Sequence, residues 1–281
     1  MENGTAARVG VVTGASAGIG LYTALGLART GMRVIMTGRD RERTEAARRF
    51  VTAHAAGASV ETALADFASL AAVRRLADEI LGRCERLDVL VNNAGLFSPQ
   101  FRLSEDGYEM TFAVNHLAPF LLTNLLLERL KASAPARVVT VASRAHRGNR
   151  IDLATIAGRH DWSMIKAYGR SKLCNILFTR ELAQRLDGTA VSAVCLHPGV
   201  VATGLAQRGG IAELGWRLAK PFMVSVEKGA ETSVFLATVP DLERFAGGYV
   251  IGKAVAHPDP AALDDSMAHR LWDESARLVG L

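Results

Sequence analysis

The sequence predicts an α/β fold in which a doubly wound parallel sheet of about seven strands carries helices on both faces. Short apolar runs rich in β-branched residues alternate with longer stretches of helical periodicity along almost the whole chain. A cluster of glycines follows the first run directly, and no linker rich in Pro, Gly or Ser interrupts the alternation. Strand and helix repeated in this way form a parallel sheet of the Rossmann type.

Seven apolar runs are the candidate strands, because each has the length and composition of a buried strand. They cover residues 9–13, 33–37, 60–64, 87–92, 137–142, 190–196 and 248–251. Helical periodicity lies between them, for example at 19–29, 42–55, 69–83 and 109–131. With 281 residues, 49% of them hydrophobic, the chain can bury a substantial core, and we expect one dinucleotide-binding domain over residues 1–281.

The most apolar stretch, residues 112–127, predicts a buried helix and not a membrane anchor. It is shorter than the roughly 20 apolar residues that a membrane span requires, and it carries Asn115, His116, Pro119 and Asn124. The first residues contain neither a basic leader nor an apolar signal core. We therefore expect a cytoplasmic protein that binds no membrane.

Charge and cysteine usage narrow the function classes. The formal net charge of +5 comes from arginines scattered among acidic residues, which does not favour nucleic-acid binding. Cys84, Cys174 and Cys195 stand far apart, without the paired spacing of a zinc site or a disulfide frame, and this fits a reducing compartment. His116 and His197 have no third ligand nearby, so we expect structural histidines and no metal site.

The glycine cluster follows the first candidate strand. Gly14, Gly18 and Gly20 lead into the first candidate helix, where free backbone N–H groups and the helix dipole can hold a pyrophosphate. Side chains there would block both the phosphate and the tight turn. The spacing G-x-x-x-G-x-G departs from the G-x-G-x-x-G of most dinucleotide binders, so a purely structural turn is the alternative.

The end of the second candidate strand favours NADP(H) over NAD(H). Gly38 stands where NAD-selective proteins carry an acidic residue for the ribose hydroxyls, and Arg39 follows it. A guanidinium at this place suits a 2′-phosphate. Asp40 adds a carboxylate beside it, and the alternative is that Arg39 only starts a solvated helix.

Polar residues also follow the third and fourth candidate strands, at the edge of the sheet where ligands bind. Asp66 could reach an adenine amino group or cap the following helix, a role for which Ser69 competes. Residues 92–95, with the sequence NNAG, place two amides and a glycine at the same edge. These residues are either ligand contacts or turn formers.

Tyr168 and Lys172 indicate acid–base chemistry, because they lie four residues apart in a helical stretch and so share one helix face. An ammonium beside a phenol lowers the phenol's pKa below its usual value of about 10, so that Tyr168 could exchange a proton near neutral pH. Ser143, just after the fifth candidate strand, could hydrogen-bond a substrate oxygen. The alternatives are a chance pair on a helix surface and a turn serine.

Together these motifs resemble the short-chain dehydrogenase/reductase family, from about residue 9 to the end of the chain. The matching motifs are TGASAGIG at 13–20, NNAG at 92–95, a serine at 143, YGRSK at 168–172 and HPGVVAT at 197–203. Longer stretches, such as VNHLAPFLLTNLLL and VASRAH, resemble the branch of the retinol dehydrogenases and the WW-domain oxidoreductase. Ala118 stands where that branch usually has glycine, a departure that concerns only local packing.

The resemblance implies a role for each matching position. Tyr168 would be the general acid/base, and Lys172 would lower its pKa and bind the nicotinamide ribose. Ser143 would polarise the substrate oxygen, and Asn115 would hold a water that links Lys172 to solvent. The implied contacts to the cofactor are Gly14, Ser16, Gly18, Ile19, Gly20, Arg39, Asp66, Phe67, Asn93, Ala94, Gly95, Tyr168, Lys172, Pro198, Gly199, Val201 and Thr203.

The resemblance also implies a substrate lid at about 203–226 and a C-terminal helical tail at about 261–281. Many family members pair through the helices that carry Asn115 and Tyr168, so a homodimer or homotetramer is a hypothesis, although the apolar stretch 112–127 could equally be core. Apolar residues that either border a substrate pocket or serve ordinary packing are Trp162, Met164, Trp216, Phe222 and Met223.

The sequence therefore predicts an NADP(H)-dependent oxidoreductase that interconverts a carbonyl and an alcohol on a fairly apolar small molecule, by hydride transfer with Tyr168 as acid/base. The richness in Ala and Arg is typical of a GC-rich bacterial genome, where a biosynthetic ketoreductase is as much to be expected as a retinoid enzyme. One alternative is a non-redox step, such as epimerisation, dehydration or cyclisation, on a biosynthetic intermediate. The other is a nucleotide-sensing binding protein.

Overall fold

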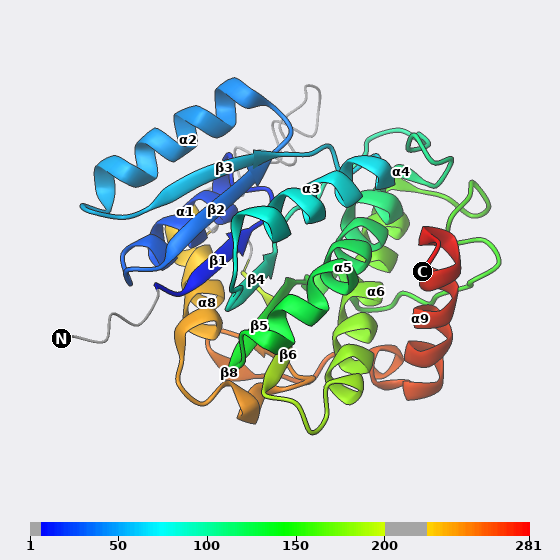
Figure 1. Cartoon of the computed structure of the whole chain (residues 1–281). Helices are drawn as coiled ribbons and strands as arrows, with labels where there is room; N and C mark the ends of the chain where they lie inside the picture. The colour runs from blue at the N-terminus through cyan, green and yellow to red at the C-terminus, as the bar shows by residue number, and fades with distance from the viewer. Residues whose placement is uncertain (1–6, 200–223) are drawn as a thin grey trace.

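One sheet contains every strand of the described chain, residues 7–199 and 224–281 of this computed structural model. The order across it is β3-β2-β1-β4-β5-β6-β7-β8 (Figure 1). The strands are β1 (Val9–Val12), β2 (Arg33–Gly38), β3 (Val60–Leu64), β4 (Val89–Asn92), β5 (Ala136–Val141), β6 (Val191–His197), β7 (Tyr249–Ile251) and β8 (Ala254–Val255). All neighbours pair parallel except β7 and β8. The predicted doubly wound parallel sheet is confirmed.

The last strand, β8, is not among the seven that the sequence predicts. It consists of two exposed residues that pair antiparallel with β7. Gly252 and Lys253 connect the two strands with φ of 57° and 70°, as a two-residue hairpin turn requires. Two exposed residues form no apolar run, and for this reason the hydrophobic pattern does not mark the strand.

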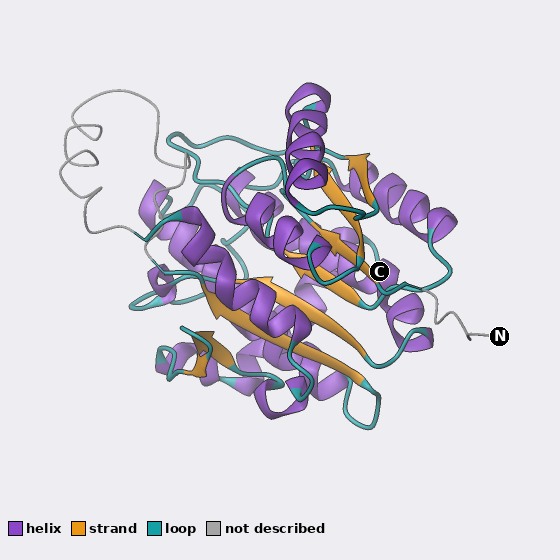
Figure 2. Cartoon of the chain, turned by 90° about the vertical axis from the view of Figure 1, so that its left-hand side faces the viewer, coloured by secondary structure: helices purple, strands orange, loops and turns teal. Residues whose placement is uncertain are grey.

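Helices cover both faces of the sheet (Figure 2). One face packs on α1 (Gly18–Ala28), α2 (Arg41–His54) and α8 (Val226–Thr238). The other face packs on α3 (Leu70–Arg83), α5 (Ala118–Ala132) and α6 (Met164–Arg185), and α9 (Asp265–Val279) lies outside α5 and α6. Strands β1, β4 and β5 are buried along their whole length because helices lie on both sides of them, which explains their continuous apolar runs.

The predicted helix at 109–131 forms in three parts. It begins as the short α4 (Met110–Phe112), passes through a π-helical turn (Ala113–Leu117) and continues as α5. By length and composition the 23 residues Met110–Ala132 could cross a membrane, but 78% of their most apolar window is buried inside the fold. The expected buried helix is therefore confirmed, and its apolar side chains belong to the core.

The C-terminal helix α9 packs on the outer side of α5 and α6. The Trp272 ring lies with its centre 4.9 Å from that of Phe120 and 5.8 Å from that of Phe178. Side chains of Arg74 and Tyr108 donate to the last carbonyl oxygens of the helix, at Val279 and Leu278. Side chains from α3, the loop after β4, α5 and α6 thus hold α9 in place.

The strand order puts the topological switch point of the sheet at the carboxyl ends of β1 and β4. From β1 the chain first builds the sheet outward through β2 and β3, and then returns to β4 on the other side of β1. Ligands of open α/β sheets bind where the order reverses in this way. The loops that follow β1, β4 and β5 therefore meet at one edge.

Candidate active site

The glycine turn after β1 lies tightly against the residues that follow β4. Gly14 and Gly18 have φ of 63° and 60°, a left-handed conformation that favours glycine. A Cβ on Gly14 would lie 2.8 Å from the Cα of Ala94, and a Cβ on Gly20 would collide with the Asn93 amide and the Gly14 carbonyl. The close packing of two loops therefore requires glycine at positions 14 and 20.

Thr13 and Asn93 hold the two loops together. The Thr13 hydroxyl accepts hydrogen bonds from the backbone N–H groups of Asn93 at 3.0 Å and Ala94 at 2.9 Å. The Asn93 side-chain amide donates to the Thr13 carbonyl at 2.7 Å and the Gly14 carbonyl at 3.2 Å. Asn92 is buried and donates to Thr123. The side chains of both asparagines thus brace the structure, and Thr13 is a site residue that the glycine pattern alone does not reveal.

The N-terminus of α1 carries no side-chain cap. Its N-cap residue is Ala17, and the first turn holds no acidic residue. In contrast, α2, α3, α6, α8 and α9 each begin with a serine or aspartate that accepts a backbone N–H bond. Open N–H groups beside a glycine turn fit a phosphate, with Ser16 and Ile19 in the same turn. The residues present therefore fit the pyrophosphate of a dinucleotide.

The end of β2 is followed by an exposed cation, Arg39, and by the capping residue Asp40. A Cβ on Gly38 would collide with the Thr44 hydroxyl. Thr44 therefore occupies the space that the acidic residue of an NAD-selective protein would need at position 38. Asp40 accepts from the Arg43 N–H at 2.9 Å as the N-cap of α2. Arg39 is exposed, and within residues 7–199 and 224–281 it forms no ion pair.

Of the two polar residues after β3, one caps a helix and the other is exposed. Ser69 caps α3, while the exposed Asp66 accepts the Ala68 N–H at 2.9 Å. The Phe67 side chain is buried in the core. Of the two candidates for the cap, Ser69 takes it, and Asp66 keeps an oxygen for another partner.

Three side chains expected to act in catalysis meet at the carboxyl end of β5. Ser143 follows β5, while Tyr168 and Lys172 lie on α6. The Lys172 Nζ atom donates to the Val141 carbonyl at 2.9 Å and lies 5.6 Å from the centre of the Tyr168 ring. Ser143 lies close enough to Tyr168 for its hydroxyl to lower the pKa of the phenol. The structure therefore brings all three residues together.

The Tyr168 pKa differs from the sequence-based expectation. Burial of the phenol raises its pKa above 10, because the charged form loses solvation, and the nearby Ser143 hydroxyl only opposes this shift. Burial thus outweighs any lowering by neighbouring groups, and the expected effect of Lys172 on the Tyr168 pKa stays a prediction. Lys172 is itself buried, which lowers its own pKa from 10.5 to about 8, and its ammonium is directed at Val141. A spacing of four residues fixes the shared face of α6 but not its burial.

Asn115 lies fully buried in the π-helical turn and ties three segments together. Its side-chain oxygen accepts from the Leu96 N–H at 2.7 Å, and its amide donates to the Leu96 carbonyl and the Ser171 hydroxyl, each at 3.0 Å. Ser171 in turn donates to the Tyr168 carbonyl at 2.8 Å. Both amide hydrogens of Asn115 are thereby used, and its side chain positions the loop after β4 against α6. Gly95 lies beside this cluster.

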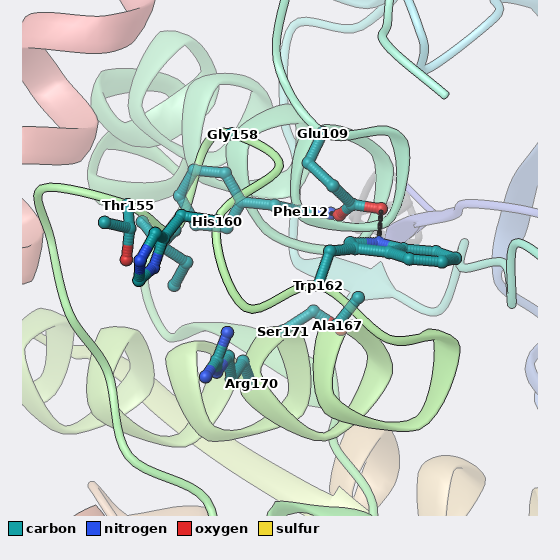
Figure 3. A pocket seen from close by; sticks show the side chains of 10 residues that line it. Glu109, Phe112, Thr155, Gly158, His160, Trp162, Ala167, Arg170 and Ser171 are labelled. Atoms are coloured by element: carbon teal, nitrogen blue, oxygen red, sulfur yellow. Dashed lines mark hydrogen bonds between the residues drawn. The ribbon is translucent and has the colours of Figure 1, made fainter. Parts of the chain in front are cut away.

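Aromatic side chains from the loop after β4 contact α6 and the segment just before it. The Phe97 ring meets Tyr168 edge-on with a centre distance of 5.0 Å, and Phe101 meets Trp162 at 5.9 Å. Figure 3 shows the Trp162 indole beside Glu109, to which its Nε1 donates at 3.1 Å. The pocket drawn there has a volume of about 10 Å³ and admits about one water.

The loop after β6 is described only at its start. Pro198 and Gly199 follow β6, and Gly199 has φ of 90°. Val201 and Thr203 lie outside the described residues, as does most of the lid expected at 203–226 with Trp216, Phe222 and Met223. The described site therefore consists of the loops after β1 to β5, the start of the loop after β6, and helix α6.

The buried thiols take no part in this arrangement. Burial raises the pKa of Cys195 to about 12 and raises the pKa of Cys174 as well, so both stay protonated. His116 is buried and hydrogen-bonds the Ser275 hydroxyl of α9 at 2.8 Å, in keeping with a structural histidine.

Comparison with known proteins connects this geometry to a family. A family model described as short chain dehydrogenase matches residues 8–212. Human retinol dehydrogenase 13 is 43% identical over 96% of this chain and 84% of that protein. The crystal structure of an uncharacterized protein from Mycobacterium paratuberculosis is similar with a TM-score of 0.78 and 35% identity, covering 97% of this chain and 93% of that one. A short chain dehydrogenase from Burkholderia cenocepacia in complex with NADP has a TM-score of 0.69 and 25% identity over 92% of this chain and 98% of that one.

Proposed function

The chain belongs to the short-chain dehydrogenase family and is an oxidoreductase, and from this premise we propose that it interconverts a carbonyl and an alcohol on a fairly apolar small molecule with NADP(H). One observation carries the proposal: Ser143, Tyr168 and Lys172 meet at the sheet edge that also holds the glycine turn. Proton exchange and cofactor binding therefore share one edge of the sheet.

The preference for NADP(H) rests on the end of β2. Arg39 is the exposed cation there, and the capping bond of Asp40 occupies one of its carboxylate oxygens. Thr44 fills the space that an acidic side chain at Gly38 would need. A guanidinium binds a 2′-phosphate with charge-assisted hydrogen bonds, whereas the ribose hydroxyls of NAD(H) gain little from it. The NADP complex of the Burkholderia cenocepacia relative agrees with this preference.

The chain's own residues supply the proton chemistry. Tyr168, with its raised pKa, is a protonated phenol at neutral pH and can donate its proton to a carbonyl oxygen in the direction of reduction. Ser143 orients the same oxygen by hydrogen bonding. Lys172, whose pKa of about 8 leaves it largely protonated at pH 7, lies close enough to favour the phenolate once the proton has left. Bound NADP(H) supplies or accepts the hydride at its nicotinamide ring.

The aromatic residues beside Tyr168 favour an apolar substrate. Phe97 lies against the Tyr168 ring, and Phe101 with Trp162 continues this wall. A pocket lined in this way binds flat or aliphatic carbonyl compounds by burying their apolar surface. Retinal belongs in the test panel because several relatives are named retinol dehydrogenases.

The deciding experiment is a fluorescence titration of the purified protein with NADPH and NADH, on the wild type and on Arg39→Asp. We expect Arg39→Asp to weaken NADPH binding about 10- to 100-fold and to leave NADH binding unchanged. Arg49→Asp, on an exposed position further along α2, is the matched control and should bind NADPH normally. Equal losses in both variants would point to a general charge effect and remove the role of Arg39.

Turnover is then measured as nicotinamide absorbance against a panel of apolar ketones and aldehydes. Oxidation of NADPH by one of them supports the reductase, and Tyr168→Phe should abolish it. Tight NADPH binding with no oxidation across the panel would instead favour a non-redox step. Binding of neither nucleotide would overturn the proposal as a whole.

A further inference from the structure

Two buried histidines hold the peptide unit that follows Ser143. The Ser143 carbonyl lies 2.6 Å from Nδ1 of His146. The N–H of Arg144, at the other side of the same peptide unit, donates to Nδ1 of His197 at 3.4 Å. His146 belongs to the 3₁₀ turn after β5 and His197 is the last residue of β6, so the two imidazoles approach from different elements.

The hydrogen-bond partners fix which nitrogen of each ring carries the proton. Nε2 of His146 accepts the Asp259 backbone N–H at 3.0 Å, so the proton of His146 lies on Nδ1 and is donated to the Ser143 carbonyl. Nδ1 of His197 accepts the Arg144 N–H, so the proton of His197 lies on Nε2. Both rings act here as neutral imidazoles, because a second proton on either would face an N–H donor.

Their surroundings keep both rings neutral. The exposed fraction of the residue is 0% for His146 and 4% for His197. Burial lowers the pKa of His197 to about 4 and also lowers that of His146, with Arg144 and Arg147 as the nearby cations. The Asp259 carboxylate opposes the shift for His146, and the Tyr249 ring packs edge-on against the same imidazole.

We propose that His146 and His197 are positioning residues that aim the Ser143 hydroxyl at the reacting oxygen by clamping the peptide unit behind it. A hydroxyl keeps its direction only while its own backbone is fixed, and Ser143 lies two residues after β5, at the start of a short 3₁₀ turn. The clamp reaches further through Asp259, whose carboxylate accepts the Gly148 N–H at 2.9 Å. A segment of the chain more than 100 residues after Ser143 is thus connected to it. The catalytic part of this role rests on the proposed function.

The clamp itself is tested without any substrate, by ¹⁵N NMR of the histidine rings in the intact protein. We expect His146 in the Nδ1–H form and His197 in the Nε2–H form, both neutral at pH 6. Assignment of the signals uses the single variants. The opposite tautomer at either ring, or a charged ring at pH 6, would overturn the clamp whatever reaction the enzyme catalyses.

Its catalytic meaning is tested with two substitutions at each position. In His197→Asn the side-chain oxygen can replace Nδ1 as acceptor, and in His146→Asn the side-chain amide can replace the Nδ1–H donor, whereas leucine at either position can do neither. We expect each leucine variant to lower kcat about tenfold at unchanged nucleotide affinity, and each asparagine variant to recover most of the loss. His54→Asn, an exposed histidine at the end of α2, is the control and should behave as wild type.

The two arms separate the possible failures. Equal losses in asparagine and leucine variants, or a loss in nucleotide affinity alone, would assign the histidines to general packing and refute their positioning role. Correct tautomers in a protein that turns over no carbonyl compound would retain the clamp and remove its catalytic meaning together with the proposed function.

Discussion

Lys172 donates its hydrogen bond to the Val141 carbonyl, two residues before Ser143 in the chain. This bond connects α6 to β5 beneath the proposed catalytic pair and explains how a buried ammonium is tolerated. The Lys172 ammonium therefore has a hydrogen-bond partner within the fold. For this reason, substitutions of Lys172 should change the free energy of unfolding as well as the activity.

The free energy of unfolding should depend on pH because the Lys172 ammonium is buried. The pKa of Lys172 is about 8 in the folded chain and about 10.4 when unfolded, so the folded chain binds fewer protons between these values and this group's contribution to stability rises with pH. Relative to Lys172→Met, the wild type should therefore gain up to about 3 kcal/mol from pH 7.5 to pH 10.5. Urea denaturation of both proteins across this range measures the difference. A constant difference would show that the ammonium is not penalised by burial.

Tyr168→Phe removes only the hydroxyl from the proposed acid/base. We expect a loss in kcat of about 10²- to 10⁴-fold with nucleotide affinity unchanged, since the phenol and not the ring moves the proton. Steady-state kinetics and a titration with NADPH measure the two quantities. Tyr22→Phe, on α1, serves as control because it also loses a phenol. Activity that survives in Tyr168→Phe would exclude this residue as the proton donor.

Because Thr44 fills the space beside Gly38, we predict that an acidic residue at position 38 is tolerated only when Thr44 is also replaced. Gly38→Asp introduces the acid typical of NAD-selective proteins, but its Cβ would collide with Thr44, so we expect a loss in stability of about 1–3 kcal/mol. Adding Thr44→Ala should return part of this loss and permit NADH to bind. A double-mutant cycle from urea denaturation measures the coupling between the two sites. Strictly additive losses would contradict the predicted contact.

Trp272 should be the side chain that holds α9 most strongly. It packs between Phe120 and Phe178 and under the guanidinium of Arg185, 4.4 Å from its ring. We expect Trp272→Ala to lower the free energy of unfolding by about 3–5 kcal/mol. Leu281→Ala, at an exposed position beyond α9, should change it by less than about 0.5 kcal/mol. Similar effects of both variants in urea denaturation would mean that α9 is not docked through Trp272.

The sequence alone predicts most of the sheet, because a parallel strand that is buried on both faces has a continuous run of apolar residues. The predicted strands at 9–13 and 137–142 differ from β1 and β5 by at most one residue at either end. The apolar pattern does not reveal β8, whose two residues are exposed, or the π-helical turn around Asn115, because one widened turn scarcely changes the periodicity of a buried helix.

Motifs located the candidate site, but the contacts within it depend on residues far apart in the chain. The role of Thr13 rests on backbone groups 80 residues away, and the burial that raises the Tyr168 pKa comes from the surrounding fold. The sequence predicts no role for His146, although this residue lies in the stretch VASRAH. The position of its proton follows only from its two folded partners, the Asp259 N–H and the Ser143 carbonyl. Sequence motifs therefore identify the candidate residues, whereas their contacts in the folded chain determine the role of each one.

The docking of α9 bears on how copies of this chain can associate. Helices α5 and α6, which follow Asn115 and carry Tyr168, have their outer sides occupied by Trp272 and its neighbours. A second molecule could pair with these helices there only after displacing a segment of the first, and it would have to replace the Trp272 contacts. The packing of α9 thus shields the Phe120 and Phe178 rings, which are 1% and 2% exposed, from any other molecule.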